Sequence, residues 1–113
     1  MTNSYVNFII RAKHAFQALD YPELDQTSKQ LLDEIAIRTS QNLTITVGDL
    51  LVLDSIGSHV TLHKKFLNLI KLGFIETSHH GDNRRTKYVS LTAKADKYYN
   101  QLEKALKKAA GNA

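Results

Sequence analysis

The chain has 113 residues and a formal net charge of +4, which allows one domain with a single modest core. It contains no cysteine, so disulfides, thiolate nucleophiles and cysteine metal sites are excluded. No segment approaches the ~20 uninterrupted apolar residues of a membrane span, and no basic stretch precedes an apolar signal core, so we expect a soluble cytoplasmic protein.

The first part of the chain predicts two helices on either side of Pro22, the only proline. The first helix should run from about Asn3 to Leu19. Its apolar surface is broader than a small domain usually buries against itself, and consists of Tyr5, Phe8, Ile9, Ala12, Phe16 and Leu19. Asp25 can cap a second helix with one apolar side, made by Leu31, Leu32, Ile35 and Ala36.

A short helix, a tight turn and a longer amphipathic helix follow, which is the helix-turn-helix arrangement. The segment LTIT at 43–46 predicts a short strand, and Thr46 can cap a helix through Leu53, with Leu50, Leu51 and Leu53 inward. The longer helix begins after the N-cap Ser58 and stops at Gly73. Its core side consists of Leu62, Phe66, Leu69, Ile70 and Gly73.

The other side of the longer helix carries Thr61, Lys64, Asn68 and Lys71, with no acid among them. Lysines offer donors for phosphates and base acceptors, and the Asn68 amide can pair with an adenine edge. Such a face suits a helix that lies in a DNA groove. The alternative interpretation is the ordinary solvated face of a surface helix.

Two strand candidates, Ile75–Ser78 and Lys87–Leu91, are joined by HHGDNRRT, whose Gly81, Asp82 and Asn83 favour a turn. Arg84 and Arg85 at the tip can reach a minor groove or its flanking phosphates, and Asp82 can shape the tip. A purely structural hairpin is the competing interpretation. Thr92 then caps a final helix to about Ala110, with an apolar stripe of Ala95, Tyr98, Leu102, Ala105 and Ala109 that Tyr99 and Leu106 widen.

Positive charge is concentrated in the later parts of the chain. Residues 1–56 carry four Lys/Arg against seven Asp/Glu, residues 57–90 carry six against two, and the remainder carries five against two. The positive field therefore coincides with the longer helix, the hairpin and the final helix.

Metal binding and catalysis find little support in the sequence. His59, His63, His79 and His80 are the metal-ligand candidates, but zinc sites need three or four convergent ligands and no HExxH pattern accompanies them. No GxSxG, P-loop or pair of carboxylates in a glycine-bounded loop is present. We therefore expect no metal, no cofactor, no catalytic residues and no enzyme activity.

The order of these elements resembles the MarR-type winged-helix transcription regulators over roughly residues 25–106. The resemblance is carried by LTITVGDLLVL before the turn, GSHVTLHKKFLNLIKLGFIE through the recognition helix, and DNRRTKYVSLTAKA across the wing. A wing with Asp, then Arg, then a strand ending in Leu-Thr is typical of that family, and Asp82, Arg84, Arg85, Leu91 and Thr92 supply it, with Asn83 as an extra residue. Typical members have longer terminal helices that pair two subunits and often enclose a pocket for a small aromatic effector.

The predicted fold is therefore mainly α with a small β-wing: a winged helix-turn-helix with N- and C-terminal dimerisation helices. It forms one domain, with an N-terminal helix at 1–20, a winged-helix core at 25–91 and a C-terminal helix at 92–110. The candidate DNA contacts are Ser58, Thr61, Lys64, Lys65, Asn68, Lys71, Arg84, Arg85 and Lys87. The candidate dimer interface consists of Phe8, Ile9, Phe16, Tyr98, Leu102 and Leu106.

The predicted function is sequence-specific binding of double-stranded DNA as a homodimer, in a transcription regulator that the resemblance implies is a repressor. Two alternatives stay open. One is a winged-helix protein-interaction module, which would expose an apolar recognition face, and the other is a plasmid or phage replication or partition protein. A small-molecule effector is left open, because both terminal helices are shorter than is typical of the family.

Overall fold

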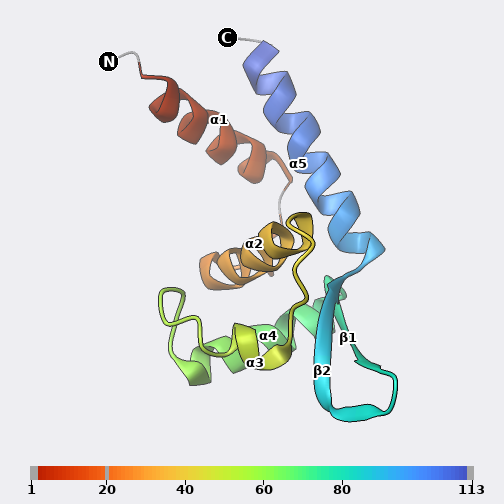
Figure 1. Cartoon of the computed structure of the whole chain (residues 1–113). Helices are drawn as coiled ribbons and strands as arrows, with labels where there is room; N and C mark the ends of the chain where they lie inside the picture. Colours follow the sequence, from red (N-terminus) through yellow and green to blue (C-terminus); the bar gives the residue numbers. More distant parts are fainter. Residues whose placement is uncertain (1–2, 20, 112–113) are drawn as a thin grey trace. The chain divides into compact units, whose positions relative to one another are not determined.

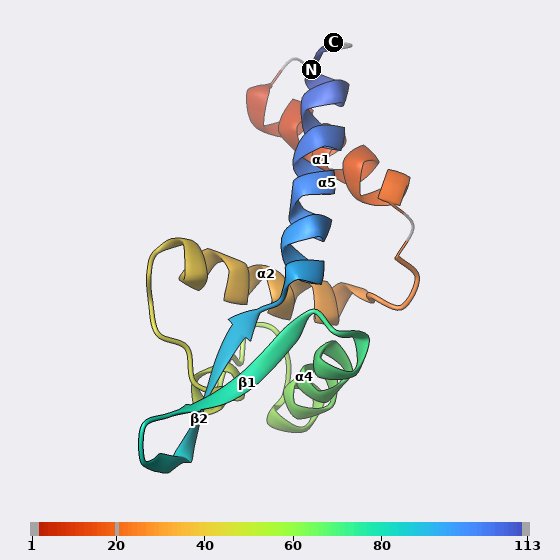
Figure 2. The same ribbon diagram turned by 90° about the vertical axis from the view of Figure 1, so that its right-hand side faces the viewer.

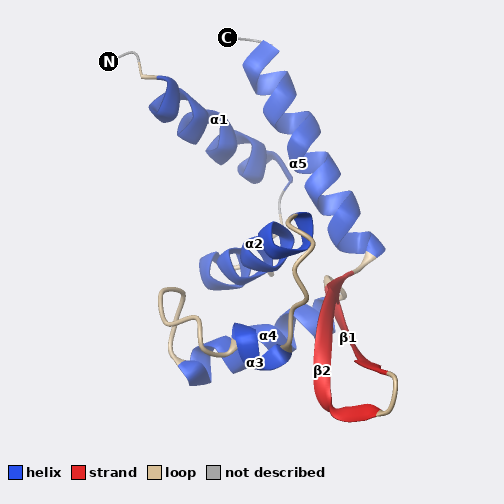
Figure 3. Ribbon diagram, viewed as in Figure 1, coloured by secondary structure: helices blue, strands red, loops and turns tan. Residues whose placement is uncertain are grey.

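The computed structural model describes residues 3–19 and 21–111 of the chain (Figures 1 and 3). Its elements are α1 (Ser4–Leu19), α2 (Gln26–Ser40), α3 (Val47–Leu50), α4 (His59–Leu72), β1 (Ile75–His80), β2 (Asn83–Leu91) and α5 (Ala93–Gly111). The predicted fold class, mainly helical with a small antiparallel wing, is confirmed. None of the described helices is long and apolar enough to cross a membrane.

The chain divides into two compact units. A unit from Glu23 to Ala95, which we call the central unit, contains α2, α3, α4 and the β1–β2 hairpin. The second unit contains α1 and the part of α5 from Asp96 onward. The helix-turn-helix and the wing predicted from the sequence both belong to the central unit.

The core of the central unit lies where α2 contacts α4 and β2, and where α4 contacts β1. Its largest buried side chains come from all of these elements and include Leu31, Leu32, Ile35, Leu50, Leu62, Phe66, Leu69, Phe74, Ile75 and Val89. Burying one such side chain stabilises the fold by about 1.5–3 kcal/mol. The buried leucines of α2 and α4 therefore pack α4 firmly against α2.

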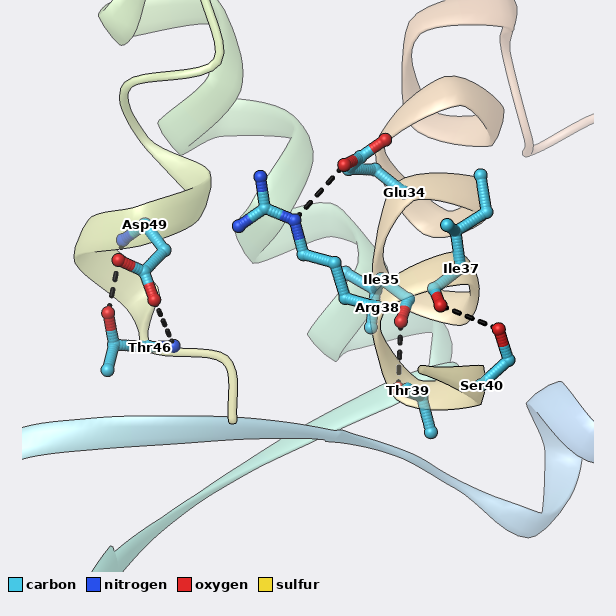
Figure 4. Close-up of polar contacts among 8 residues, drawn as sticks. All are labelled: Glu34, Ile35, Ile37, Arg38, Thr39, Ser40, Thr46 and Asp49. Atoms are coloured by element: carbon cyan, nitrogen blue, oxygen red, sulfur yellow. Dashed lines mark hydrogen bonds and ion pairs between the residues drawn. The ribbon is translucent and has the colours of Figure 1, made fainter. Parts of the chain in front are cut away.

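The helix starts in the central unit follow the predicted caps. The Asp25 carboxylate accepts a hydrogen bond from the Ser28 amide at 2.7 Å and begins α2. Thr46 and Asp49 form a capping box at α3, in which the Thr46 amide donates to the Asp49 carboxylate at 3.0 Å (Figure 4). That backbone hydrogen bond holds the pKa of Asp49 below its ordinary value.

Two boundaries before α4 differ from the prediction. The helix predicted through Leu53 ends at Leu50, and the His59 Nδ1–H donates to the Leu51 carbonyl at 3.1 Å. A helix through Leu53 would bond the Leu53 amide to the Asp49 carbonyl, but that amide donates to the Leu50 carbonyl, three residues earlier, at 3.4 Å. The strand predicted at 43–46 is reduced to one bridge between Thr46 and Tyr88, with the Val89 amide donating to the Ile45 carbonyl at 2.9 Å.

The end of α4 is closed by several hydrogen bonds around Gly73. This residue adopts φ 84°, the left-handed conformation that favours glycine, and the Phe74 amide donates back to the Leu69 carbonyl at 3.0 Å. The Thr92 hydroxyl donates to the Gly73 carbonyl at 2.5 Å, and the Lys94 ammonium donates to the Leu72 carbonyl at 2.6 Å. The start of α5 thus satisfies carbonyls that the recognition helix leaves open.

Candidate nucleic-acid interface

The exposed side of α4 brings together four of the predicted DNA contacts. Lys64, Asn68 and Lys71 line one hollow on the helix surface together with Lys65 and Leu67. Lys64 and Lys71 are exposed and Asn68 is half-buried. No acidic residue occurs anywhere in α4, so a phosphate that approaches this hollow meets cations and one amide.

Ser58 and Thr61 have structural partners at the start of α4. Ser58 is the N-cap: its hydroxyl oxygen accepts from the Thr61 amide at 3.2 Å, and its own O–H donates to the Thr61 hydroxyl at 3.0 Å. Both predicted DNA contacts therefore first serve to begin the recognition helix. They lie at the N-terminal end of α4, which is the part of a recognition helix that would be nearest the bases.

Lys65 is placed differently from Lys64. Its ammonium forms an ion pair with the Asp25 carboxylate at the N-cap of α2, although Lys65 also borders the hollow. Burial alone raises the pKa of Asp25, but the hydrogen bonds that Asp25 accepts from Lys65 and from the Ser28 amide outweigh it and lower the pKa. We therefore remove Lys65 from the predicted DNA contacts, because this cation already has an anionic partner.

Substituting Asp25 by asparagine should isolate the ion pair, because asparagine keeps the N-cap but loses the charge. A carboxylate with a lowered folded pKa stabilises the fold above its unfolded pKa of about 3.9, and this contribution is lost as the pH falls through the folded value. The pair is partly exposed, so we expect Asp25→Asn to lower the unfolding free energy at pH 7 by less than about 1 kcal/mol. Urea unfolding from pH 7 to pH 3 should show the difference shrinking with acid. If the two proteins differ in unfolding free energy by the same amount at both pH values, the substitution destabilises the fold through the N-cap rather than through the ion pair.

Val60 and Leu67 are exposed apolar residues on the polar side of α4, at 77% and 50%. Ile70, predicted on the core side, is also exposed at 36%, because it lies on the flank of the buried stripe of Leu62, Phe66 and Leu69. The exposure of Val60 and Leu67 could have been predicted from their spacing. Positions 60, 64, 67 and 71 lie along one side of a helix, so these two residues share that side with the lysines.

The wing is a hairpin with a long irregularity near its tip, beside α4 in the central unit (Figure 2). Ser78 pairs with Tyr88 and His80 pairs with Asn83, so the single residue His79 on β1 lies opposite residues 84–87 on β2. The His79 Nδ1–H donates to the Thr86 carbonyl at 3.1 Å, and the His80 ring stacks on Tyr88 with centroids 3.9 Å apart. These contacts hold the bulged stretch in a defined shape.

The predicted loop HHGDNRRT is mostly strand in the structure. Gly81 adopts φ 57°, and the turn needs only Gly81 and Asp82 between the strands. Arg84, Arg85 and Lys87 therefore lie in the bulged part of β2, and all three are exposed. Arg85 and Lys87 also line a hollow with Thr46, Val47 and Gly48 at the start of α3. The cations of the wing therefore lie next to the start of α3, the first helix of the helix-turn-helix.

Three of the histidines serve local structure. His59 and His79 hydrogen-bond to backbone carbonyls and His80 stacks on Tyr88. Within residues 3–19 and 21–111, no three His, Cys, Asp or Glu side chains gather as a metal site would require.

The predicted dimer residues of α1 have large exposed apolar area. Phe8 and Ile9 are exposed, as are Tyr5 and Ile10, and Ala15 is the buried residue of the described helix. We call Tyr5, Phe8 and Ile9 the apolar face of α1. The sequence pattern misses Ile10, which lies off the predicted stripe.

The remaining predicted dimer residues are less exposed. Phe16, Leu102 and Leu106 are half-buried. Tyr98 is fully buried, with its ring edge-on to Tyr21 at 5.1 Å and to Tyr99 at 4.9 Å between centroids. Because Tyr98 lies inside its own chain, we remove it from the predicted interface.

No family model matches the sequence, and no curated protein matches it either. Among solved structures, the chain is similar to S. aureus MepR bound to ethidium bromide, with a TM-score of 0.68 and 16% sequence identity over 99% of this chain and 80% of that chain. MepR is a MarR-family regulator. The likeness shows the fold, so the chain has the MarR-type winged-helix fold that its sequence predicts.

Proposed function

We propose that the chain is a cytoplasmic transcription regulator of the MarR type that binds double-stranded DNA sequence-specifically as a homodimer, and that it represses by occluding a promoter. The observation that carries the proposal is the surface of α4, a capped helix whose exposed Lys64 and Lys71 line one hollow with the half-buried Asn68, and which contains no acid. We include no effector, since ethidium bromide belongs to the MepR structure alone.

Each element of the central unit has a role in the proposed DNA complex. The N-terminal half of α4 enters the major groove, where Thr61, Lys64 and Asn68 are nearest the bases and Lys71 is nearer a phosphate. The exposed wing cations Arg84, Arg85 and Lys87 bind phosphates or a minor groove beside it. The hollow at the start of α3 adds Thr46 and Gly48 to this phosphate-binding surface.

The apolar face of α1 supports the dimer. An exposed surface of aromatic and branched aliphatic side chains is unfavourable in water, and a second copy of the chain would cover it. Two copies related by a two-fold axis would place two α4 helices on one side of a duplex. The bound site should then be a pseudo-palindrome with half-sites about 10 to 10.5 base pairs apart, or a multiple of that.

A gel-shift experiment with genomic fragments at several salt concentrations tests the proposal. We expect some fragments to be retarded well below the protein concentration needed for bulk DNA, with affinity that falls steeply as salt rises. Equal and weak retardation of all fragments would contradict sequence-specific binding. No retardation at low salt would contradict DNA binding altogether.

Asn68→Ala should relax the preference at one base-pair position in each half-site. If the Asn68 amide makes two hydrogen bonds to an adenine edge, its removal costs about 1–3 kcal/mol at that position. Selection from random duplexes, followed by affinity measurements on the selected site, would detect this. Lys71→Ala is the comparison, because removing a cation that binds phosphate should weaken all sequences alike. An unchanged motif and affinity for Asn68→Ala would contradict its assignment as a base-reading residue.

A further inference from the structure

The most exposed line of α4 alternates apolar and cationic side chains. Val60, Lys64, Leu67 and Lys71 are separated by four, three and four residues, which places them along one side of the helix. Val60 is the most exposed large hydrophobic residue of the described chain, and Leu67 keeps half of its surface. The core does not need either residue, because Leu62, Phe66 and Leu69 fill it from the opposite side.

The lysines argue against a protein groove as the partner of this line. A helix that docks in an apolar groove presents anchors at i, i+3, i+4 and i+7. Counted from Val60, the i+4 position is Lys64, and Leu67 is followed four residues later by Lys71. Each apolar side chain therefore has an exposed cation next to it along the helix, and the two form no continuous apolar surface.

The DNA major groove offers a partner with matching chemistry. It presents one apolar group to a recognition helix, the C5 methyl of thymine, and that methyl lies between rows of phosphates. The lysines would bind the anionic or acceptor groups and the aliphatic side chains would bind the methyls. We propose that Val60 and Leu67 are specificity-determining residues that contact thymine methyl groups in each half-site, an inference that rests on the proposed function.

The spacing along α4 gives the proposal a geometric form. Seven residues of helix span about 10 Å, and successive base pairs are about 3.4 Å apart. A helix lying along the groove would therefore place Val60 and Leu67 against two thymines about three base pairs apart. Val60, in the first turn after the N-cap Ser58, would contact the one deeper in the groove.

Deoxyuridine substitution tests this directly, because deoxyuridine pairs as thymidine does and lacks only the methyl. In the selected site, each thymidine of a half-site is replaced singly and the affinity of the natural-sequence protein is measured. We expect a loss of about fourfold at two positions about three base pairs apart, the effect of removing one buried methyl group. The same scan is then repeated with Val60→Ala and with Leu67→Ala. Each variant should become insensitive to one of the two substitutions and keep its response to the other.

Ile37→Ala is the matched control, since Ile37 on α2 is 51% exposed, close to the value for Leu67. It should reproduce the natural-sequence scan. Alanine suits an exposed helix position, so the variants should fold, and the scan with the natural-sequence protein needs no variant. A selected motif without thymines, a flat deoxyuridine scan, or equal penalties with and without the two side chains would overturn the inference while leaving DNA binding in place. Variants that bind the site normally but lose a protein partner would overturn it as well. Failure of all fragments to bind is the separate outcome that contradicts the proposed function.

Discussion

Phe8→Asp should convert the proposed dimer into a monomer. Phe8 is 49% exposed on the apolar face of α1, and in a two-fold interface the substitution removes the same side chain from both copies. Full burial of such a side chain contributes about 1.5–3 kcal/mol, and dimerisation can bury only the exposed half of each Phe8, so the two copies together lose about 1.5–3 kcal/mol, or at least about tenfold in Kd. The introduced carboxylate adds the cost of desolvating a charge within the apolar face. Sedimentation equilibrium at micromolar concentration would measure the change.

Asn7→Asp provides the control for this substitution. Asn7 is the exposed preceding residue, and it lies on the opposite side of α1, so the variant adds the same charge away from the apolar face. We expect it to remain a dimer. Phe8→Asp should also weaken binding to the full pseudo-palindrome, because a monomer reads one half-site. A natural-sequence protein that sediments only as a monomer, or a Phe8→Asp variant that stays dimeric, would contradict the interface.

The starts of the central helices and the end of α4 could be predicted from the sequence, because they depend on contacts between neighbouring residues. Asp25, Thr46 and Ser58 each accept a hydrogen bond from an amide three residues later, and the Thr92 hydroxyl accepts from the Ala95 amide. Gly73 adopts the left-handed conformation that its residue type favours. Each of these features needs information from only a few neighbouring residues, which the sequence contains in full.

The contacts of individual helix side chains could be predicted less well from the sequence. Lys64 and Lys65 look equivalent in the sequence, but Lys65 pairs with Asp25, a residue 40 positions earlier. The same limit applies to Tyr98, whose helical stripe indicates an apolar surface but not whether that surface meets its own chain or a second copy. Periodicity identifies the side of a helix, whereas the partner on that side depends on tertiary packing.

The wing shows a third kind of limit. Glycine and the polar residues after it indicate that a turn lies near 81–83, but strand register is set by pairing across the hairpin. His80 pairs with Asn83, and the offset is absorbed by residues 84–87 opposite His79. The arginines therefore lie in a bulged strand rather than a loop. A bulged strand held by the hydrogen bond between His79 and Thr86 orders these cations better than a loop would, which lowers the entropic cost of binding phosphate.

Replacing both Arg84 and Arg85 by alanine should make DNA binding weaker and visibly less dependent on salt. Each phosphate that the protein no longer neutralises should lower the slope of log K against log salt by about 0.9, so the four arginines lost from a bound homodimer should lower it by about 3.6. Between about 50 and 200 mM salt, the affinity of the natural-sequence protein should then fall about 150-fold more than that of the variant. Gel shifts or fluorescence anisotropy on the selected site, at four or more salt concentrations, would measure both slopes.

Lys97→Ala with Lys104→Ala is the control that separates phosphate binding from net charge. Both lysines are exposed on α5, so this variant removes the same two charges at a distance in sequence from the wing and α4. Its slope should stay close to that of the natural-sequence protein, because only cations that neutralise phosphates release counterions. The melting temperature of the arginine variant should hardly change, since exposed charges contribute little to stability. Equal slopes for the natural-sequence protein and the arginine variant would show that the wing does not contact phosphate. If both double variants lower the slope by the same amount, the effect comes from net charge rather than from the bulged strand.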